Sequence, residues 1–424
     1  MTDHARSGTA DGPVAGPLVA APPAALYVHI PFCVSLCPYC DFVVYAGGAA
    51  RGPKARVEAF LEALLAELDL RANRLDDRFG RDRPPLETVY MGGGTPSLLP
   101  AESVTGILAR IRERFGLART AEVSLEANPG PDERGDAATW RAAGITRLSI
   151  GAQSLTDAEL RRLGRRHRSA DVASAVREAR DAGIASVSLD LLYDLPASSE
   201  TGWAATLDAA LALEPDHLSL YALTLDDPDA EGLTGPAGDH LPTTAGARRW
   251  RSRARPEQDE DRAATQYVHA TERLEADGWR GYEISNWARP GHESRHNLVY
   301  WQRRPYEAIG PGAHAFDGLT RRWNAARLDS YLSALAPASG KTRQPRLPPG
   351  GTETLDAATA AAESIILALR TDRGLPAAEA SRPSLGAIFE QARTDGLVAT
   401  SGDGRLVLTT RGRLLSNELF ARLV

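Results

Sequence analysis

Short runs of apolar and β-branched residues alternate with longer stretches of helical periodicity from residue 25 to about residue 220. Arg56–Leu75 is the plainest helical stretch, because its apolar residues recur every three or four positions. Six of the short runs predict β-strands, with helical sequence between them: Ala25–Ile30, Thr88–Met91, Glu122–Ala127, Arg147–Ile150, Ser186–Leu191 and His217–Leu220.

Strand–helix repeats of this kind predict an α/β fold with a parallel sheet and right-handed crossovers. Six repeats are fewer than the eight of a closed barrel. We therefore expect an open, partial (β/α)6 barrel. In such sheets ligands bind at the C-terminal ends of the strands.

The pattern becomes less regular after residue 220. Gly232–Asp261 is rich in Gly, Pro, Arg and acidic residues, and we expect a partly flexible excursion before a helix over Arg262–Asp277. The aromatic, Gly-rich segment Gly278–Phe316 is expected to close one mouth of the barrel. The chain thus divides into a tail (1–24), a barrel with its aromatic extension at 278–316 (25–336), a linker (337–353) and a mainly helical, winged-helix-like C-terminal domain (354–424).

Composition changes this picture little. Hydrophobic residues at 43% and charged residues at 25% are typical of a soluble globular chain. A net charge of −6 gives no support for nucleic acid as a partner. Lys54 and Lys341 are the only lysines, so arginine supplies the other basic residues and a lone Arg is weak evidence of function. The tail carries no basic region followed by a long apolar run, which predicts disorder rather than a signal peptide.

The cysteines carry the first chemical signal. All three lie in one eight-residue window with the spacing Cys33-x3-Cys37-x2-Cys40. An odd count in so short a window argues against a disulfide framework. Three thiolates on a tight loop can hold three irons of a [4Fe–4S] cluster and leave the fourth iron open to a small molecule. A Cys3His zinc site with His29 is the alternative.

The cysteine spacing resembles the cluster loop of radical S-adenosylmethionine (SAM) enzymes, in which the open iron binds SAM and the cluster supplies the electron that cleaves it. Unpaired thiols and an oxygen-sensitive cluster lead us to expect a cytoplasmic protein. Phe32 and Tyr27 are expected to shape the loop.

Polar or glycine-rich segments follow several of the predicted strands. Gly92–Gly94 would let the backbone approach a ligand closely. Glu126 ends the third strand and could bind the ribose hydroxyls or the amino group of SAM; the alternative is an ordinary exposed acid at a strand end. Arg165 could bind a carboxylate through two hydrogen bonds. Asp190 lies in an apolar strand and therefore needs a partner.

Several motifs together resemble the oxygen-independent coproporphyrinogen dehydrogenase superfamily over nearly all of residues 26–424. They are Tyr-x-His-Ile-Pro-Phe-Cys, Gly-Gly-Gly-Thr-Pro, Gly-x-Gln-Ser and Asp-Leu-x-Tyr-x-Leu-Pro. The resemblance implies that Tyr27, Gly93 and Glu126 bind the cluster-bound SAM. It also aligns the chain with positions that bind a second SAM in the dehydrogenases: Tyr39, Gly94, Thr95, Gln153, Arg165, Asp190 and Ala222.

Two departures point to one branch of this superfamily. The dehydrogenases carry a further cysteine two residues after the third cluster ligand, where this chain has Phe42. In addition, the run from His296 to Trp301 matches the His-Asn-x-x-Tyr-Trp motif of the haem chaperone (HemW-type) branch. That branch binds haem and delivers it to respiratory haem proteins.

The second motif also has a physical rationale. The His296 imidazole could ligate iron, while Tyr300 and Trp301 offer flat apolar faces for a porphyrin. A histidine near two aromatic rings is by itself more often a core residue, and only the resemblance reverses that preference. His292 competes with His296 for the ligand role. The haem set is therefore predicted as His296, Asn297, Tyr300 and Trp301.

The resulting hypothesis is a haem chaperone with one [4Fe–4S] cluster, one SAM, and haem between the barrel mouth and residues 282–301. Recipient haem proteins are the expected partners, and any association with a membrane is expected through them alone. A true coproporphyrinogen III dehydrogenase is the first alternative. A zinc-stabilised interaction protein that binds neither SAM nor haem is the second.

Overall fold

The computed structural model describes residues 19–49, 56–335 and 344–424. Most of the predicted tail and residues 336–343 of the boundary region therefore lie outside the described residues. The chain divides into two compact units. The larger comprises residues 20–300 and 304–354, and the smaller comprises 355–424 together with residue 19 and residues 301–303, so the last residue of the helix Arg295–Trp301 falls in the smaller unit.

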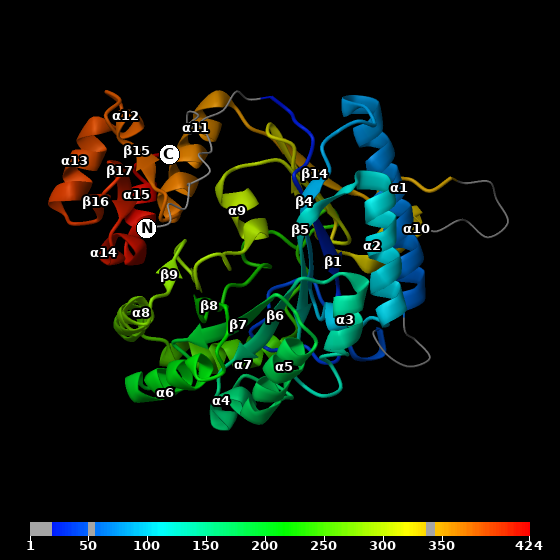
Figure 1. The fold of residues 1–424 in the computed structure, drawn as a ribbon, viewed down its shortest axis with the longest axis horizontal. Helices are drawn as coiled ribbons and strands as arrows, with labels where there is room; N and C mark the ends of the chain where they lie inside the picture. The colour runs from blue at the N-terminus through cyan, green and yellow to red at the C-terminus, as the bar shows by residue number, and fades with distance from the viewer. Residues whose placement is uncertain (1–18, 50–55, 336–343) are drawn as a thin grey trace, which may run out of the picture. The chain divides into compact units, whose positions relative to one another are not determined.

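A sheet with seven parallel strands organises the larger unit (Figure 1). Six of these strands confirm the six predicted ones, and β1 and β8 do not pair with each other, so the barrel is partial and open. The parallel strands, in spatial order, are β11 (Tyr306–Ile309), β1 (Ala25–Ile30), β4 (Leu86–Gly93), β5 (Leu117–Ala127), β6 (Arg147–Gln153), β7 (Ser186–Tyr193) and β8 (His217–Ala222).

Antiparallel strands extend both edges of this sheet. They are β10 (Asn286–Ala288) and β9 (Arg280–Gly281) beyond β8, and β12 (His314–Phe316), β13 (Thr320–Asn324) and β14 (Gly350–Thr354) beyond β11. The predicted linker is thus wrong at its C-terminal end, because β14 pairs residue by residue with β13. The short strands β2 (Phe32–Cys33) and β3 (Tyr45–Ala46) form a separate parallel pair.

Helices connect the parallel strands and cover the outer face of the sheet (Figure 1). The helices of the larger unit are α1 (Val57–Phe79), α2 (Ala101–Phe115), α3 (Ala137–Ala143), α4 (Asp157–Arg162), α5 (Ser169–Asp181), α6 (Glu200–Leu211), α7 (Ala245–Ala254), α8 (Glu260–Ala276), α9 (Arg295–Trp301) and α10 (Leu328–Leu335). Helix α7 lies inside the predicted flexible excursion, so that prediction is corrected over residues 245–254.

Alternation along each strand separates an apolar from a polar face. In β1, Leu26, Val28 and Ile30 are buried in the core shared with the helices. Tyr27 and His29, between them, lie on the opposite face, which lines the barrel interior. The other parallel strands repeat this arrangement, so the main core lies between sheet and helices and the interior is polar.

The segment before and within α9 closes the N-terminal end of the barrel. The backbone N–H of His296 donates to Glu122 Oε1 (3.0 Å), and Arg147, the first residue of β6, donates to the carbonyl of His292 (2.9 Å). Tyr282 Oη pairs with Nε2 of His217, the first residue of β8 (2.9 Å). These contacts place residues 282–296 at the end of the barrel opposite the cysteine loop, whereas Tyr306–Ile309 of the same predicted segment form a strand of the barrel wall.

The smaller unit is a winged-helix-like arrangement of helices and a three-stranded antiparallel sheet in the order β15-β17-β16. Its elements are α11 (Ala357–Arg370), β15 (Leu375–Pro376), α12 (Ala377–Ala380), α13 (Gly386–Thr394), β16 (Val398–Thr400), β17 (Arg405–Leu408), α14 (Thr410–Leu414) and α15 (Ser416–Phe420). Across the described parts of both units, no helix combines the length and apolar character needed to cross a bilayer.

Candidate cluster and SAM site

The cysteine loop leaves the C-terminal end of β1 and is held at its base by the β2–β3 pair. Phe32 is fully buried and packs edge-on against Phe60, with ring centroids 5.2 Å apart. The loop closes with a hydrogen bond from the N–H of Cys40 to the carbonyl of Cys37 (3.1 Å). The three cysteines are free and partly exposed, so their thiols are available as ligands.

The glycine segment Gly92–Gly94, at the end of β4, packs directly on this loop. The N–H of Gly94 donates to Ile30 and that of Thr95 donates to Phe32 (2.8 and 2.7 Å). A Cβ on Gly94 would lie 2.6 Å from the carbonyl oxygen of Phe32. Gly93 has a φ of +111°, and a Cβ there would meet the ring of His29 at 2.5 Å. Glycine is therefore required at position 94 by contact with the loop, and at position 93 by its positive φ and by contact with the His29 ring of β1.

A chain of hydrogen bonds links two of the cysteines. Cys33 Sγ lies 3.2 Å from Thr95 Oγ1, which accepts from Asn128 Nδ2 (3.0 Å). Asn128 Oδ1 accepts from Arg165 Nη2 (2.5 Å), and Arg165 Nη1 donates to Cys37 Sγ (3.4 Å). Since Thr95 already accepts from the amide, its own hydrogen can point at the Cys33 sulfur. Asn128 was not among the predicted site residues.

Arg165 brings a buried positive charge beside these thiols. Its Nη2 also donates to the carbonyl of Gly151 (2.9 Å), while its Nε has no hydrogen-bond partner among the described residues. Burial raises the pKa of the Cys33 thiol to about 12 and raises that of Cys40 as well. Partly exposed thiols beside a guanidinium whose Nε lacks a partner among the described residues fit a site for an anionic thiolate–metal group, because ligation removes the thiol protons.

Glu126 lies at the end of β5, next to the glycine segment. Its carboxylate accepts from the N–H of Gly93 (2.9 Å) and from Tyr90 Oη (2.8 Å). Burial raises the pKa of Glu126 to about 7, and the Asp190 carboxylate adds to this rise against the effect of the two hydrogen bonds. Burial also raises the pKa of Asp190, which accepts from Ser149 Oγ (3.0 Å). Both carboxyls would gain from an ammonium group placed between them.

The remaining residues of the predicted SAM set also lie on the interior or at strand ends. Tyr27 Oη lies 3.0 Å from His29 Nδ1. Gln153 ends β6 at an irregularity in the strand register, with a left-handed φ of 65° that re-aims its side chain. Ala222 is the last residue of β8, and the Tyr39 ring lies 6.3 Å from that of Trp250.

His29 does not behave as a metal ligand in this structure. Its Nε2 pairs with the carbonyl of Val43 (2.8 Å) and its Nδ1 with Tyr27, so both ring nitrogens are engaged. In the described ranges, no three His, Cys, Asp or Glu side chains gather around a single metal position. The Cys3His zinc alternative would need His29 to give up one of these two hydrogen bonds.

Arg251 of α7 holds the cysteine loop from outside. The residue is only 5% exposed, and its guanidinium donates to the carbonyls of Pro38 (3.1 Å), Tyr39 (3.3 Å) and Cys40 (3.0 Å). A further bond reaches the carbonyl of Asp226. The guanidinium therefore fixes the backbone between the second and third cysteines. No prediction assigned a role to Arg251, because arginine is so common in this chain.

The predicted haem motif lies away from this loop, at the N-terminal end of the barrel. His296 is 1% exposed, with Nδ1 2.8 Å from Thr88 Oγ1 and Nε2 2.8 Å from Tyr300 Oη. Burial lowers the pKa of His296 to about 3. The N–H of Asn297 donates to Ser294 Oγ, and Arg370 lies 4.7 Å from the ring centroid of Trp301 in the smaller unit. A haem ligand at His296 stays a prediction, and ligation would break one of its two side-chain hydrogen bonds.

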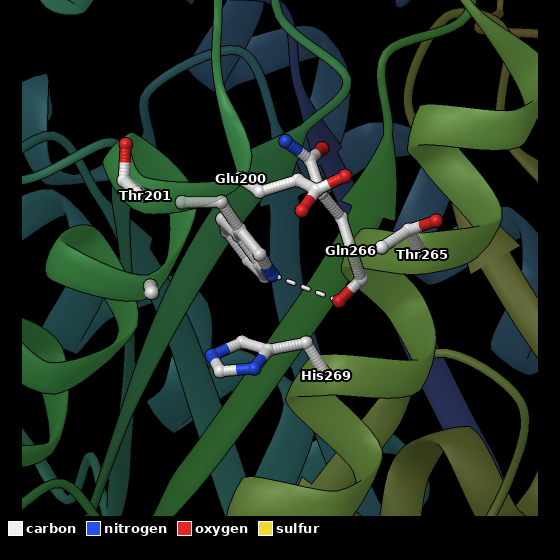
Figure 2. A pocket seen from close by; sticks show the side chains of 7 residues that line it. Glu200, Thr201, Thr265, Gln266 and His269 are labelled. Carbon is white, nitrogen blue, oxygen red and sulfur yellow. Dashed lines mark hydrogen bonds between the residues drawn. The ribbon is translucent and has the colours of Figure 1, made fainter.

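A cavity of about 240 Å³ opens between α6 and α8 (Figure 2). Glu200, Thr201 and His269 lie on its wall, and two further lining residues are joined by a hydrogen bond from Trp203 Nε1 to the carbonyl of Gln266 (2.9 Å). None of the predicted site residues lines this cavity. We therefore place the functional site at the cysteine loop.

The fold and this loop are those of the radical SAM superfamily, whose family model matches residues 27–209. The coproporphyrinogen III oxidase HemN of Escherichia coli, a radical SAM enzyme, has the same fold with a TM-score of 0.76. The match covers 96% of this chain and 91% of that one at 21% sequence identity, so it supports the fold alone.

More similar relatives define the branch. The heme chaperone HemW of Mycobacterium tuberculosis is 40% identical over 406 residues, 95% of each chain. HemW of Bacillus subtilis is 31% identical over 403 residues, 93% of this chain and 97% of its own length. The chain belongs to the HemW family of the radical SAM superfamily, as the sequence motifs predicted.

Proposed function

We propose that this protein is a haem chaperone that carries a SAM-ligated [4Fe–4S] cluster and delivers haem to respiratory haem proteins in the cytoplasm. The observation that carries the proposal is the match over 95% of the chain to proteins named heme chaperones. Phe42 supports it, because this residue stands where the coproporphyrinogen dehydrogenases have a further cysteine, and it is 64% exposed.

The cluster would be held by Cys33, Cys37 and Cys40. A bound cluster with SAM supplies one-electron reduction of a sulfonium. Thr95 and Arg165 would donate hydrogen bonds to the ligating sulfurs, which stabilises the thiolate charge.

The SAM would be held chiefly by polar groups of the barrel interior. Glu126, with its raised pKa, would pair with the amino group and thereby become ionised. Gly93 and Gly94 would let the backbone approach the ligand, and Tyr27 would line the same space. Gln153, Asp190, Tyr39 and Ala222 complete the proposed set. Thr95 and Arg165, which were predicted to bind a second SAM, contact cluster cysteines instead. We therefore assign the remaining residues to one SAM rather than two.

The test is haem uptake and transfer by the cluster-loaded protein. The full-length chain is reconstituted with iron and sulfide without oxygen and titrated with hemin, and the Soret band is recorded. Saturable one-to-one uptake, followed by transfer to an apo haem protein, is the expected result. Absence of specific uptake would overturn the proposal.

Turnover of coproporphyrinogen III provides the opposing measurement. The cluster-loaded protein is incubated anaerobically with SAM, a reductant and coproporphyrinogen III, and the porphyrin products are separated by chromatography. We expect no protoporphyrinogen IX. Its formation at a catalytic rate would instead support the dehydrogenase alternative.

A further inference from the structure

Arg147, the first residue of β6, carries a buried positive charge that is only partly satisfied. It is 3% exposed, and its Nη1 donates to Ser186 Oγ and to the carbonyl of His292, both at 2.9 Å. Both of these acceptors are uncharged. Its Nη2 is also buried and has no hydrogen-bond partner among the described residues.

Asp190 of β7 does not neutralise this charge. Burial raises the pKa of Asp190, and Arg147 is one of the groups that oppose the rise, so the two charges influence each other. The Asp190 carboxylate nevertheless accepts from Ser149 Oγ (3.1 and 3.0 Å), and no hydrogen bond joins it to Arg147 in the described part of the chain. A buried guanidinium in this state favours the binding of an anion, because an unpaired charge is costly away from water.

A second unsatisfied donor lies beside Arg147. The register of β5 and β6 pairs Ser124 with Arg147. Both side chains point to the barrel interior, because their chain neighbours Val123, Leu125 and Leu148 pack in the core. Ser124 is fully buried, and its Oγ has no hydrogen-bond partner among the described residues. One charged and one neutral donor on adjacent strands match the two oxygens of a carboxylate.

These two donors adjoin the predicted haem motif. Tyr90 pairs with Ser124 in the register of β4 and β5, and its ring centroid lies 5.2 Å from that of His296. On the other side, Arg147 bonds the carbonyl of His292 in the segment that leads into α9. The donors and His296 are therefore neighbours at the N-terminal end of the barrel.

We propose that Arg147 and Ser124 form a carboxylate site, and that its ligand is a propionate side chain of the haem. This inference rests on the proposed haem-binding function. Haem carries its carboxylates at the edge of the porphyrin, so a carboxylate site beside His296 would fix the rotation of the ring while the histidine holds the iron. The step is hydrogen bonding alone: Nη2 of Arg147 and the hydroxyl of Ser124 donate to the carboxylate oxygens.

The position of the site favours haem over SAM as the source of the carboxylate. SAM would bind the open iron through its own carboxylate and amino group, and the cysteine loop leaves the C-terminal end of β1. Arg147 stands at the opposite end, at the start of β6. Residues 292–296 hold both Arg147, through the carbonyl of His292, and the 1% exposed His296. One displacement of this short segment would give haem access to both groups.

The test compares hemin with hemin dimethyl ester, in which the carboxylates are masked while the iron and the ring are unchanged. Both are titrated into the cluster-loaded protein, and the Soret band is recorded. Wild type should bind hemin about tenfold to a hundredfold more tightly than the ester, the usual contribution of hydrogen bonds to a charged group. Arg147→Gln should lose most of this preference by weakening the binding of hemin alone, and Ser124→Ala should lose less of it.

Two further variants serve as controls. Arg147→Lys keeps the charge without the planar fork, so it should retain part of the preference for hemin over the ester. Arg295→Gln removes an exposed arginine at the same end of the barrel, whose Nη1 donates to the carbonyl of Thr120, and should behave as wild type.

Each other outcome overturns the inference. Equal weakening of hemin and ester binding in Arg147→Gln would show a structural role, and equal affinity of wild type for hemin and ester would show that no carboxylate is bound; both leave the proposed function standing. Calorimetry should give the same SAM affinity in wild type and Arg147→Gln. Loss of SAM binding with an intact preference for hemin would assign the site to SAM. No hemin uptake by wild type would overturn the proposed function as well.

Discussion

The carboxamide of Asn128 lies between two side chains that each contact a cysteine of the cluster loop. Its Nδ2 donates to Thr95, which turns the threonine hydrogen toward Cys33, and its Oδ1 accepts from Arg165. One amide thus orients donors toward two sulfurs. Hydrogen bonds to cluster sulfurs help to set the reduction potential.

Asn128→Asp should therefore lower the reduction potential of the reconstituted cluster. A carboxylate cannot donate to Thr95, so the threonine hydrogen turns away from Cys33, and a negative charge is added nearby. A hydrogen bond to a charged group contributes about 1.5–3 kcal/mol of stabilisation, so its loss should change the reduction potential by a detectable amount. An EPR-monitored redox titration measures the change. Asn73→Asp is the control, because Asn73 also accepts from an arginine but lies on α1. Equal potentials in the two variants would contradict the role of Asn128.

Glu126 should make the cluster-free protein less stable as the pH rises. The pKa of Glu126 is raised from 4.5 to about 7 in the folded chain. Its contribution to the free energy of unfolding is therefore complete below pH 4.5 and is lost as the pH rises through about 7. The side chain of Glu126→Gln stays neutral at every pH. Between pH 5 and pH 8, the free energy of unfolding of this variant should therefore rise relative to that of wild type by on the order of 2 kcal/mol. Urea unfolding at both pH values tests this. A stability difference that is the same at pH 5 and pH 8 would show that the carboxyl does not titrate in this window.

Single residues were predictable where a motif marked them. Gly93, Gly94 and Glu126 stand at strand ends in the sequence and meet at the loop in the structure. Asn128 and Arg251 were not predictable, because an amide after a strand and one arginine among many have no distinguishing pattern. Their roles appear only when segments far apart in sequence come together.

Helix α7 joins the excursion after β8 to the cysteine loop. Through Arg251 it donates hydrogen bonds to three successive loop carbonyls, those of Pro38, Tyr39 and Cys40. The helix escaped prediction because its sequence, rich in arginine, shows no broad apolar stripe. Strand β11 was not predicted for a different reason: its four residues, within an aromatic segment, are too few to show a period of two.

Arg251→Gln should weaken cluster retention. Each carbonyl that loses its donor costs about 1–3 kcal/mol if it stays buried, so the loop between Cys37 and Cys40 should loosen. Iron and sulfide per chain, measured after anaerobic reconstitution and again after exposure to a chelator, should fall below the wild-type values. Arg253→Gln, an exposed position on the same helix, should retain the wild-type content. Equal retention in both variants would mean that α7 does not support the loop.

The larger unit as a whole forms the proposed SAM site, because β1, β4, β5, β6, β7 and β8 each contribute a residue to it. A ligand that binds only the folded chain stabilises it by about 2.7 kcal/mol at one hundred times its Kd. SAM should therefore raise the melting temperature of the cluster-loaded protein measured by calorimetry. The cluster-free protein should show a much smaller shift, since the open iron is part of the site. An equal shift in both forms would place SAM away from the cluster.

The overall architecture was largely predictable, since strand–helix alternation depends on local periodicity and on general rules of connection. The position of the haem motif was not. Nothing in the sequence shows that the two-turn helix carrying His296 enters the N-terminal end of the barrel and hydrogen-bonds with Thr88. That arrangement depends on contacts between residues 208 positions apart in the chain.

The two faces of each strand tie the folding of this chain to its chemistry. Residues that face the barrel interior and residues that pack against the helices alternate one by one, as Leu26, Tyr27, Val28 and His29 do. Deleting or inserting a single residue in such a strand would exchange the two sets, placing phenol and imidazole against the helices and aliphatic side chains against the ligand. Length changes in these six strands should therefore be far less tolerated than substitutions, and a library that varies the interior should keep every strand at its present length.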